Sequence, residues 1–171
     1  GIFTVLDGAQ CVGHIPVDIK DIGCDAYFGS LHKWMLAPPG TGFLYVRKER
    51  ITDIWTTFAG GQWDNHEDEG YRLSQRGTGN LSLLMGLSAA LDFHFRVGPE
   101  KVYSRIKYLG DYLRAGLRKI PKMEIQTSPH SDMCAGITVY NIKGMEPGKI
   151  MDELWRRKKI RIRGVRQSTH I

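Results

Sequence analysis

The stretch DAYFGSLHKWMLAPPGTGFLYV, residues 25–46, decides the fold of this chain of 171 residues. It holds two short apolar runs, one that reaches Ser30 and one that starts at Gly42, separated by a turn rich in proline and glycine. Apolar runs of this length without polar alternation predict strands buried on both faces, as in a sheet covered by helices. Between them stands one cation, Lys33, among small and apolar residues. A lysine in such company either extends its amine to water at an edge or has a chemical role.

The remaining pattern predicts alternating strands and helices around this stretch. The run FTVLD ends at Asp7 and predicts a strand upstream, whereas from Asn80 onward the apolar residues recur at helical spacing. Gly98-Pro99 closes that helix and opens a second amphipathic helix. This order indicates part of an α/β layer, a long connecting helix and a small α+β unit. The last unit is predicted to contain strands near residues 123–127 and 136–142, a helix from Pro147, and a terminal strand at IRIR, residues 160–163.

Charge divides the chain at the same place. Residues 1–98 carry 8 Lys and Arg against 11 Asp and Glu, whereas residues 99–171 carry 16 against 7. We therefore predict a domain boundary near Gly98-Pro99. The run RRKKIRIRGVR, residues 156–166, has two interpretations: a nucleic-acid-binding surface, whose affinity would fall steeply with salt, or a helix end followed by an edge strand. We favour the second, because the run has no interleaved aromatic residues, and this argues against nucleic acid as a partner.

Composition is typical of a soluble globular protein, with 42% hydrophobic and 25% charged residues. No apolar run approaches the roughly 20 residues of a membrane-spanning helix. The three cysteines, Cys11, Cys24 and Cys134, form no CxxC pair, which indicates reduced thiols and a cytoplasmic location. The chain starts without methionine, almost directly in a strand, and ends without a cap, so we expect it to be a fragment of a longer protein.

Polar side chains at the predicted strand ends form a candidate site. Asp7 ends the first strand, Ser30 ends the second, and His32 and Lys33 follow. Ligands of open α/β sheets gather outside the carboxyl ends of the strands, and an acid, a hydroxyl, an imidazole and an amine suit a phosphorylated cofactor with a ring nitrogen. Three residues also have ordinary structural interpretations: Asp7 as part of a turn, His32 as a buried core histidine, and Thr78 as a helix cap.

The segment LDGAQCVGHIPVDIKDIGCDAYFGSLHKWMLAPPGTGFLYVRKE, residues 6–49, resembles the core of the class V aminotransferase family. These are fold-type I pyridoxal-phosphate enzymes that include cysteine desulfurases, selenocysteine lyases and isopenicillin N epimerase-like proteins. RGTGN, residues 76–80, resembles the Gly-Thr element of the family. The resemblance implies that residues 1–98 are the C-terminal half of the large cofactor-binding domain, with a mainly parallel sheet and helices. Residues 99–171 are then a connecting helix and a truncated small α+β C-terminal domain.

Carried over residue by residue, the resemblance implies pyridoxal 5′-phosphate as the cofactor and a role for each member of the candidate site. Lys33 is the Schiff-base lysine and later moves the proton at the substrate α-carbon. Asp7 pairs with the pyridinium nitrogen, because a carboxylate there keeps the ring protonated. Gln10 hydrogen-bonds the phenolic oxygen of the ring, and Ser30 and His32 hold the phosphate.

The resemblance also implies a homodimer with shared active sites, in which Gly77 and Thr78 reach the phosphate of the cofactor in the other subunit. The resemblance places the residues that bind the substrate carboxylate and stack on the cofactor ring outside this chain. If residues 1–171 stand alone, we therefore expect weak cofactor binding and exposed apolar surface. One metal candidate, DNHEDE at residues 64–69, is better interpreted as a solvated loop, so we expect no metal.

The choice of reaction rests on the end of the chain. Desulfurases of this family need a nucleophilic cysteine after a vRxGxHC-like strand end, and the nearest match, VRQSTHI at residues 165–171, has Ile171 in that place. Cys134 lies too early in the chain to match. This favours an aminotransferase or epimerase-like enzyme acting at the α-carbon of an amino acid, and Trp63 resembles the tryptophan-bearing loop of the epimerase-like branch. The alternative is carbon–sulfur or carbon–selenium cleavage of the desulfurase and selenocysteine lyase type.

Overall fold

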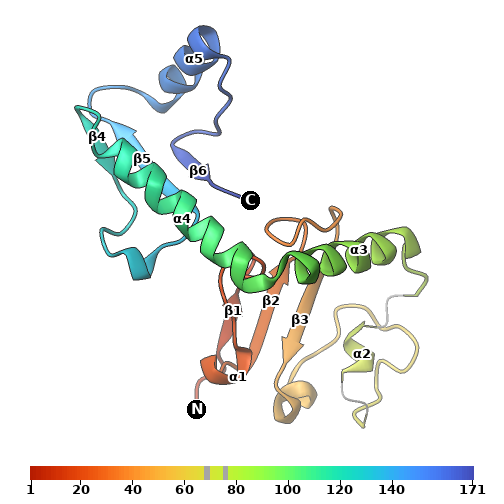
Figure 1. Cartoon of the computed structure of the whole chain (residues 1–171). Coiled ribbons are helices and arrows are strands. Elements are labelled where there is room, and N and C mark those ends of the chain that lie inside the picture. The colour runs from red at the N-terminus through yellow and green to blue at the C-terminus, as the bar shows by residue number, and fades with distance from the viewer. Residues whose placement is uncertain (68–69, 75–76) are drawn as a thin grey trace. The chain divides into compact units, whose positions relative to one another are not determined.

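The chain forms two compact units, Gly1–Arg96 and Val97–Ile171, in a computed structural model (Figure 1). The structure describes residues 1–67, 70–74 and 77–171. The division between the units falls close to the Gly98-Pro99 junction. The assignment of the units to a cofactor-binding domain and a small C-terminal domain stays a prediction.

The first unit is built on a three-stranded sheet in the order β1-β2-β3. β1 (Val5–Asp7) runs parallel to β2 (Ala26–Ser30), and β3 (Gly42–Val46) runs antiparallel to β2. Because β1 and β2 are parallel, their carboxyl ends, Asp7 and Ser30, lie at the same edge of the sheet. Three short helical segments connect or follow these strands: α1 (Ile19–Ile22), η1 (Lys48–Asp53) and α2 (Tyr71–Ser74).

The core of this unit lies between the segment after β2 and α3 (Leu81–Val97), and Phe43 of β3 packs against it from one face of the sheet. α3 approaches closely because Gly86 has no side chain: a Cβ there would lie 2.4 Å from Cγ of Pro38. Asn80 caps the N-terminus of α3: its Oδ1 accepts a hydrogen bond from the N–H of Ser82 at 3.0 Å. The buried members of the core are Leu31, Met35, Ala37 and Ala90, with Val12, Phe43, Leu87 and Leu91 packed against them.

The prediction that the strands are buried on both faces is wrong for the other face of the sheet. Residues paired across neighbouring strands share a face, so Val5, Phe28 and Leu44 lie on the same side. Their exposed fractions are 52%, 40% and 53%. An apolar run shows that a strand face favours burial, but it does not show whether the covering element belongs to the same chain.

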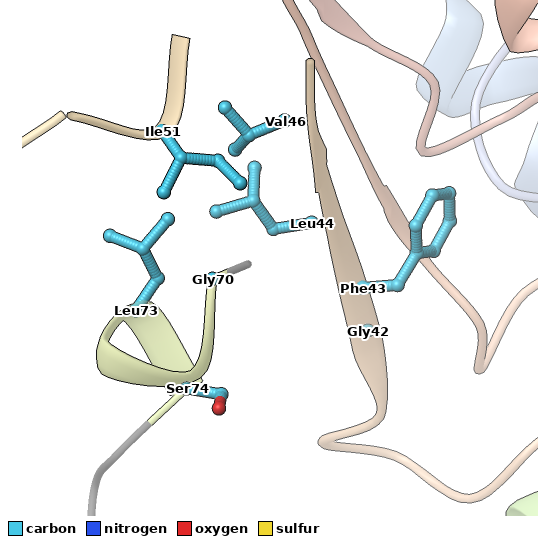
Figure 2. A pocket seen from close by; sticks show the side chains of 8 residues that line it. All are labelled: Gly42, Phe43, Leu44, Val46, Ile51, Gly70, Leu73 and Ser74. Carbon is cyan, nitrogen blue, oxygen red and sulfur yellow. The ribbon is translucent and has the colours of Figure 1, made fainter. Parts of the chain in front are cut away.

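A pocket lies beside β3 on this second face (Figure 2). Leu44 and Val46 point toward Ile51 of η1 and Leu73 of α2, and Phe43 points to the opposite side of the strand. The pocket encloses about 390 Å³. Its lining is mostly apolar, and it follows the strand rather than the edge where Asp7 ends β1. We therefore assign it to the partial cover of the sheet and not to the predicted site.

The second unit packs one long helix against an antiparallel sheet in the order β4-β5-β6 (Figure 1). β4 pairs with the C-terminal half of β5 and β6 with its N-terminal half. Val102, Ile106 and Leu117 are buried, which confirms that the helix from Pro99 is amphipathic. The elements of this unit are α4 (Pro99–Leu117), β4 (Met123–Ile125), η2 (Ser131–Met133), β5 (Ile137–Ile142), α5 (Pro147–Lys158) and β6 (Arg166–Ser168).

A buried arginine of α4 forms hydrogen bonds with β5 and the segment before it. Arg114 is 2% exposed, and its Nη1 donates to the carbonyl of Ala135 at 2.8 Å and to Oγ1 of Thr138 at 3.1 Å. Its Nη2 donates to Asp111 at 2.8 Å. Burial alone would raise the pKa of Asp111, but hydrogen bonds, led by that from Lys107, outweigh it and lower this pKa to about 2. The carboxylate therefore stays charged and keeps the arginine paired.

The predicted terminal strand at residues 160–163 is wrong, because that stretch packs back on α5 instead of joining the sheet. Lys159 ends α5 in the left-handed conformation, with φ of 56°. Arg161 then lies over the ring of Trp155, 5.2 Å from its centroid. Gly164, with φ of 63°, turns the chain into β6, which pairs with β5. Arg161 and Ile162 line a pocket beside α5, and only Arg163 of this stretch forms a β-bridge, with Arg166.

Candidate active site

The chain leaves β1 through tight turns that begin at the first predicted site residue. Oδ1 of Asp7 accepts the N–H of Ala9 at 2.9 Å, so the residue does perform the turn role that its type allows. The N–H of Gly8 donates to the carbonyl of Phe28 at 2.8 Å and ties the turn to β2. Asp7 is exposed at the strand end, and its carboxylate is accessible to a ligand.

Gly8 is required in this turn because a tyrosine ring lies directly against it. A Cβ at Gly8 would lie 1.9 Å from Oη of Tyr27. Tyr27 is 3% exposed, and burial raises the pKa of its hydroxyl to about 12. Its ring stacks with that of Phe43 at a centroid distance of 5.9 Å. The turn that carries Asp7 therefore rests on a rigid, uncharged aromatic surface.

The loop after β2 carries the lysine. The N–H of Ala37 donates to the carbonyl of Leu31 at 3.1 Å, which closes the intervening residues into a compact loop. Lys33 is half-buried in this loop, and His32 is exposed. The interpretation of His32 as a buried core histidine is therefore wrong. Its neighbour Leu31 takes the inward position and leaves the imidazole at the surface.

One hydrogen bond and one ring stack join the two turns. Nε1 of Trp34 donates to Oε1 of Gln10 at 2.9 Å. The ring of Trp34 lies on that of His14 at a centroid distance of 3.8 Å and an interplanar angle of 5°. Nδ1 of His14 lies 2.8 Å from the carbonyl oxygen of Gln10. This link was not predicted from the sequence, because the hydrogen bond joins residues 24 positions apart.

Five predicted residues thus lie at one edge of the sheet, and we call them the strand-edge set: Asp7, Gln10, Ser30, His32 and Lys33. The first two lie on the turn after β1, Ser30 ends β2, and the last two follow it. The set offers an amine, a carboxylate, an amide, a hydroxyl and an imidazole. These groups match the aldehyde, the ring nitrogen, the phenolic oxygen and the phosphate of pyridoxal phosphate, so the donor set fits that cofactor.

Gly77 and Thr78 lie apart from this set, in an exposed segment that precedes α3. Gly77 has φ of 78°, a conformation that glycine adopts without strain. The helix-cap interpretation of Thr78 is wrong, because Asn80 caps α3. Within the described part of the chain, no hydrogen bond or ion pair joins Gly77 or Thr78 to the strand-edge set. Arg76, the first residue of the RGTGN motif, lies outside the described residues.

Residues 64–67, the described part of the predicted metal candidate, show local loop contacts. Oδ1 of Asn65 accepts the N–H of Glu67 at 2.9 Å. Asp68 and Glu69 lie outside the described residues, and within the described ones no group of three His, Cys, Asp or Glu side chains is arranged to hold a metal. Trp63 lines a nearby pocket of about 170 Å³.

The helices described in residues 1–67, 70–74 and 77–171 are all too short or too polar to cross a bilayer.

Local contacts occupy several cations of the basic run at residues 156–166. Arg156 pairs with Glu153 at 3.0 Å and lowers the pKa of that carboxyl. Lys159 and Arg161 lie over the ring of Trp155 at 5.4 and 5.2 Å from its centroid. These contacts support the interpretation of the run as a helix end, and the nucleic-acid interpretation gains no support from them.

The chain belongs to the Aminotransferase class-V family, whose family model matches residues 1–170. Among curated relatives, isopenicillin N epimerase from Streptomyces clavuligerus is 29% identical over 175 residues, which cover 94% of this chain and 44% of the relative. Apo cysteine desulfurase from Thermococcus onnurineus NA1 matches with a TM-score of 0.84 at 24% identity, over 98% of this chain and 47% of that one. A mutant of C-DES with glycine covalently linked to its PLP cofactor matches with a TM-score of 0.80 at 24% identity, over 95% and 46%.

These matches confirm the predicted family and the fold-type I fold class. The chain spans about half the length of the relatives that it matches. The relatives differ in their reactions, because one is an epimerase and another a desulfurase. Membership of the family therefore does not fix the reaction.

Proposed function

We propose that this chain is the lysine-bearing part of a pyridoxal-phosphate-dependent enzyme that acts at the α-carbon of an amino acid, by aminotransferase or epimerase-like chemistry. One observation carries the proposal. The carboxylate of Asp7 lies on the turn after β1 and the amine of Lys33 on the loop after β2. A hydrogen bond of 2.9 Å from Trp34 to Gln10 joins these two segments. When bound, pyridoxal phosphate supplies a protonated ring that withdraws electrons from the substrate α-carbon. The strand-edge set offers the groups that this ring and its phosphate require.

Each member of the strand-edge set has a role in this proposal. Lys33 holds the cofactor through Nζ and moves the proton at the substrate α-carbon. The carboxylate of Asp7 favours the protonated form of the ring nitrogen, because an adjacent negative charge stabilises the cation. Gln10 donates to the phenolic oxygen. Ser30 and His32 contact the phosphate, and the exposed position of His32 suits a dianionic group that keeps part of its hydration.

The proposal extends to a homodimer with shared sites. Gly77 and Thr78 are exposed and not used in capping α3, so they are available to contact the phosphate of the cofactor in the other subunit. A cytoplasmic location is part of the same proposal. The thiols of Cys11, Cys24 and Cys134 are all free, as in a reducing compartment.

Desulfurase chemistry is the second candidate, and the similarity to a cysteine desulfurase at a TM-score of 0.84 favours it. The residue types argue for the first candidate instead. Ile171 occupies the place that the family pattern gives to the nucleophilic cysteine. The thiol of Cys134 lies 3.4 Å from the carbonyl of His130, beside η2, where it donates locally.

Incubation of the full-length protein with amino acids in deuterium oxide separates the reaction classes. Epimerase-like chemistry gives deuterium at the α-carbon with loss of optical activity, and aminotransferase chemistry gives an oxo acid when an amino acceptor is present. Release of alanine from cysteine, with sulfide formed when a thiol reductant is added to take up the transferred sulfur, would overturn the first assignment in favour of the second.

Spectroscopy of the lysine-bound cofactor tests the role of Lys33 directly. Full-length protein mixed with pyridoxal phosphate should develop an absorbance band near visible wavelengths, and Lys33→Ala should abolish it. Lys20→Ala is the matched control, because Lys20 is an exposed lysine on α1 of the same unit. A band that survives Lys33→Ala would show that another amine holds the cofactor.

A further inference from the structure

We propose that Trp34 is a positioning residue, whose indole N–H fixes the side-chain amide of Gln10 so that its Nε2 group is presented to the cofactor. This inference rests on the proposed function and assigns Trp34 a task within the same site. The reacting atoms are not touched by the indole. Its influence passes through Gln10 on one turn and through the adjoining Lys33 on the other.

The hydrogen bond from Trp34 fixes the orientation of the Gln10 amide. An indole nitrogen can only donate, so the atom of Gln10 that lies 2.9 Å from Nε1 of Trp34 is the carbonyl oxygen Oε1. The other end of the amide is then the NH₂ group, which can only donate. A phenolic oxygen that carries negative charge needs donors and is repelled by a carbonyl. Trp34 therefore selects the end of the amide that suits this oxygen.

The indole of Trp34 is held rigidly by burial and by stacking on His14. Trp34 is 4% exposed and His14 is 6% exposed, and their rings are stacked within 5° of parallel. Nδ1 of His14 lies 2.8 Å from the carbonyl oxygen of Gln10, which can only accept, so this nitrogen carries the proton. Gln10 is thus held at its backbone by His14 and at its side chain by Trp34, and the two holding rings support each other.

Trp34 is also the neighbour of Lys33 in the sequence. It directly follows Lys33, so the stack that orients Gln10 also anchors the backbone of the lysine. A Cβ at Gly13 would lie 2.8 Å from the carbonyl carbon of Trp34, which shows that the two turns are in close backbone contact there. One buried side chain therefore sets the relative position of two residues that face the same ligand.

Trp34→Phe tests the inference in the full-length protein, because a phenyl ring keeps a stacking surface for His14 but has no donor. We expect the dissociation constant for pyridoxal phosphate to rise about tenfold. We also expect a higher pH midpoint for the visible band of the lysine-bound cofactor, because loss of a donor makes the phenolic oxygen more basic. Gln10→Ala should produce the same two changes. Trp155→Phe, at a half-exposed tryptophan of the second unit, is the control and should produce neither.

The double variant Trp34→Phe/Gln10→Ala gives the decisive comparison. Phenylalanine at position 34 keeps the ring stack beside Lys33 and removes only the indole donor, which acts through Gln10. The double variant should therefore bind the cofactor about as tightly as Gln10→Ala alone. Effects that multiply, or a pH midpoint unchanged in Trp34→Phe, would overturn the inference and leave the proposed function standing. Absence of any visible band in the unsubstituted protein would overturn both.

Gln10→Glu provides a second test if Trp34→Phe does not fold. A carboxylate at position 10 still accepts the indole N–H, so the packing is kept, but it offers no donor to the phenolic oxygen. We expect weaker cofactor binding and a higher pH midpoint with an unchanged unfolding temperature of the cofactor-free protein. Unchanged binding and midpoint in Gln10→Glu would overturn the inference.

Discussion

Replacing Gly13 with alanine tests the close contact between the two turns of the candidate site. Gly13 has φ of 81°, and a Cβ there would lie 2.7 Å from Sδ of Met35 and 2.8 Å from its backbone nitrogen. Gly23 is a matched control, because it has a similar φ of 70° but no atom closer than 3.9 Å to an added Cβ. Both alanine variants carry the strain of the left-handed conformation, and Gly13→Ala adds a steric clash with Met35.

The cost of each variant follows from these contacts. The left-handed conformation costs an L-residue about 1–2 kcal/mol, which applies to Gly13→Ala and Gly23→Ala alike. Overpacking against backbone atoms adds about 1–3 kcal/mol at Gly13 alone, since the turns must separate to admit the methyl group. We therefore expect the free energy of unfolding to fall by about 2–5 kcal/mol in Gly13→Ala and by about 1–2 kcal/mol in Gly23→Ala.

Urea denaturation of the two variants, followed by titration with pyridoxal phosphate, measures both consequences. Separation of the turns moves Trp34 and with it Lys33, so Gly13→Ala should bind the cofactor at least about tenfold more weakly, whereas Gly23→Ala should bind it normally. Equal losses of stability in the two variants, together with unchanged cofactor affinity in Gly13→Ala, would refute the reasoning that backbone contact at Gly13 sets the site.

Two further predictions concern the second unit. Gly110→Ala should destabilise this unit by about 2–4 kcal/mol in chemical denaturation, because a Cβ there would lie 2.2 Å from the carbonyl oxygen of Ala135. Gly116→Ala on the same helix is the control: its Cβ meets no atom within 4 Å, so it should stabilise the unit by up to about 1 kcal/mol. A stabilising Gly110→Ala would contradict the described packing of α4. The pKa of Asp111 is lowered to about 2 in the folded chain, so its contribution to stability is complete above its ordinary pKa near 3.8 and is lost as the pH falls through 2. Asp111→Asn should therefore remove roughly 1 kcal/mol of the acid-dependent stability measured between pH 4 and pH 2, a small value because the carboxylate is partly exposed and screened.

The sequence predicted those parts of the fold that depend on local pattern. The helical spacing from Asn80 and from Pro99 gave α3 and α4, and the apolar runs gave β1, β2 and β3. The prediction of a terminal strand at residues 160–163 was wrong because the same alternation suits a segment packed on a helix. The left-handed conformation of Lys159 directs the chain back onto α5. Local pattern contains no information on which surface an alternating segment will meet.

The candidate site shows the same limit. The order of Asp7, Ser30 and Lys33 along the chain predicted that all three lie at one sheet edge, because parallel strands bring their carboxyl ends together. The hydrogen bond from Trp34 to Gln10 spans 24 positions of sequence and depends on how two turns pack, so no local pattern specifies it. The roles of these residues toward a cofactor stay proposals that the substitutions above test.

The open face of the first sheet affects how this chain behaves in the laboratory. Val5, Phe28 and Leu44 present neighbouring apolar side chains to water on adjacent strands. Such surfaces adhere to one another, and adhesion grows with protein concentration. The apparent molar mass of a preparation limited to these 171 residues, measured by light scattering, should therefore rise with protein concentration. Ligand titrations of that preparation should be done in dilute solution, where self-association does not compete with binding.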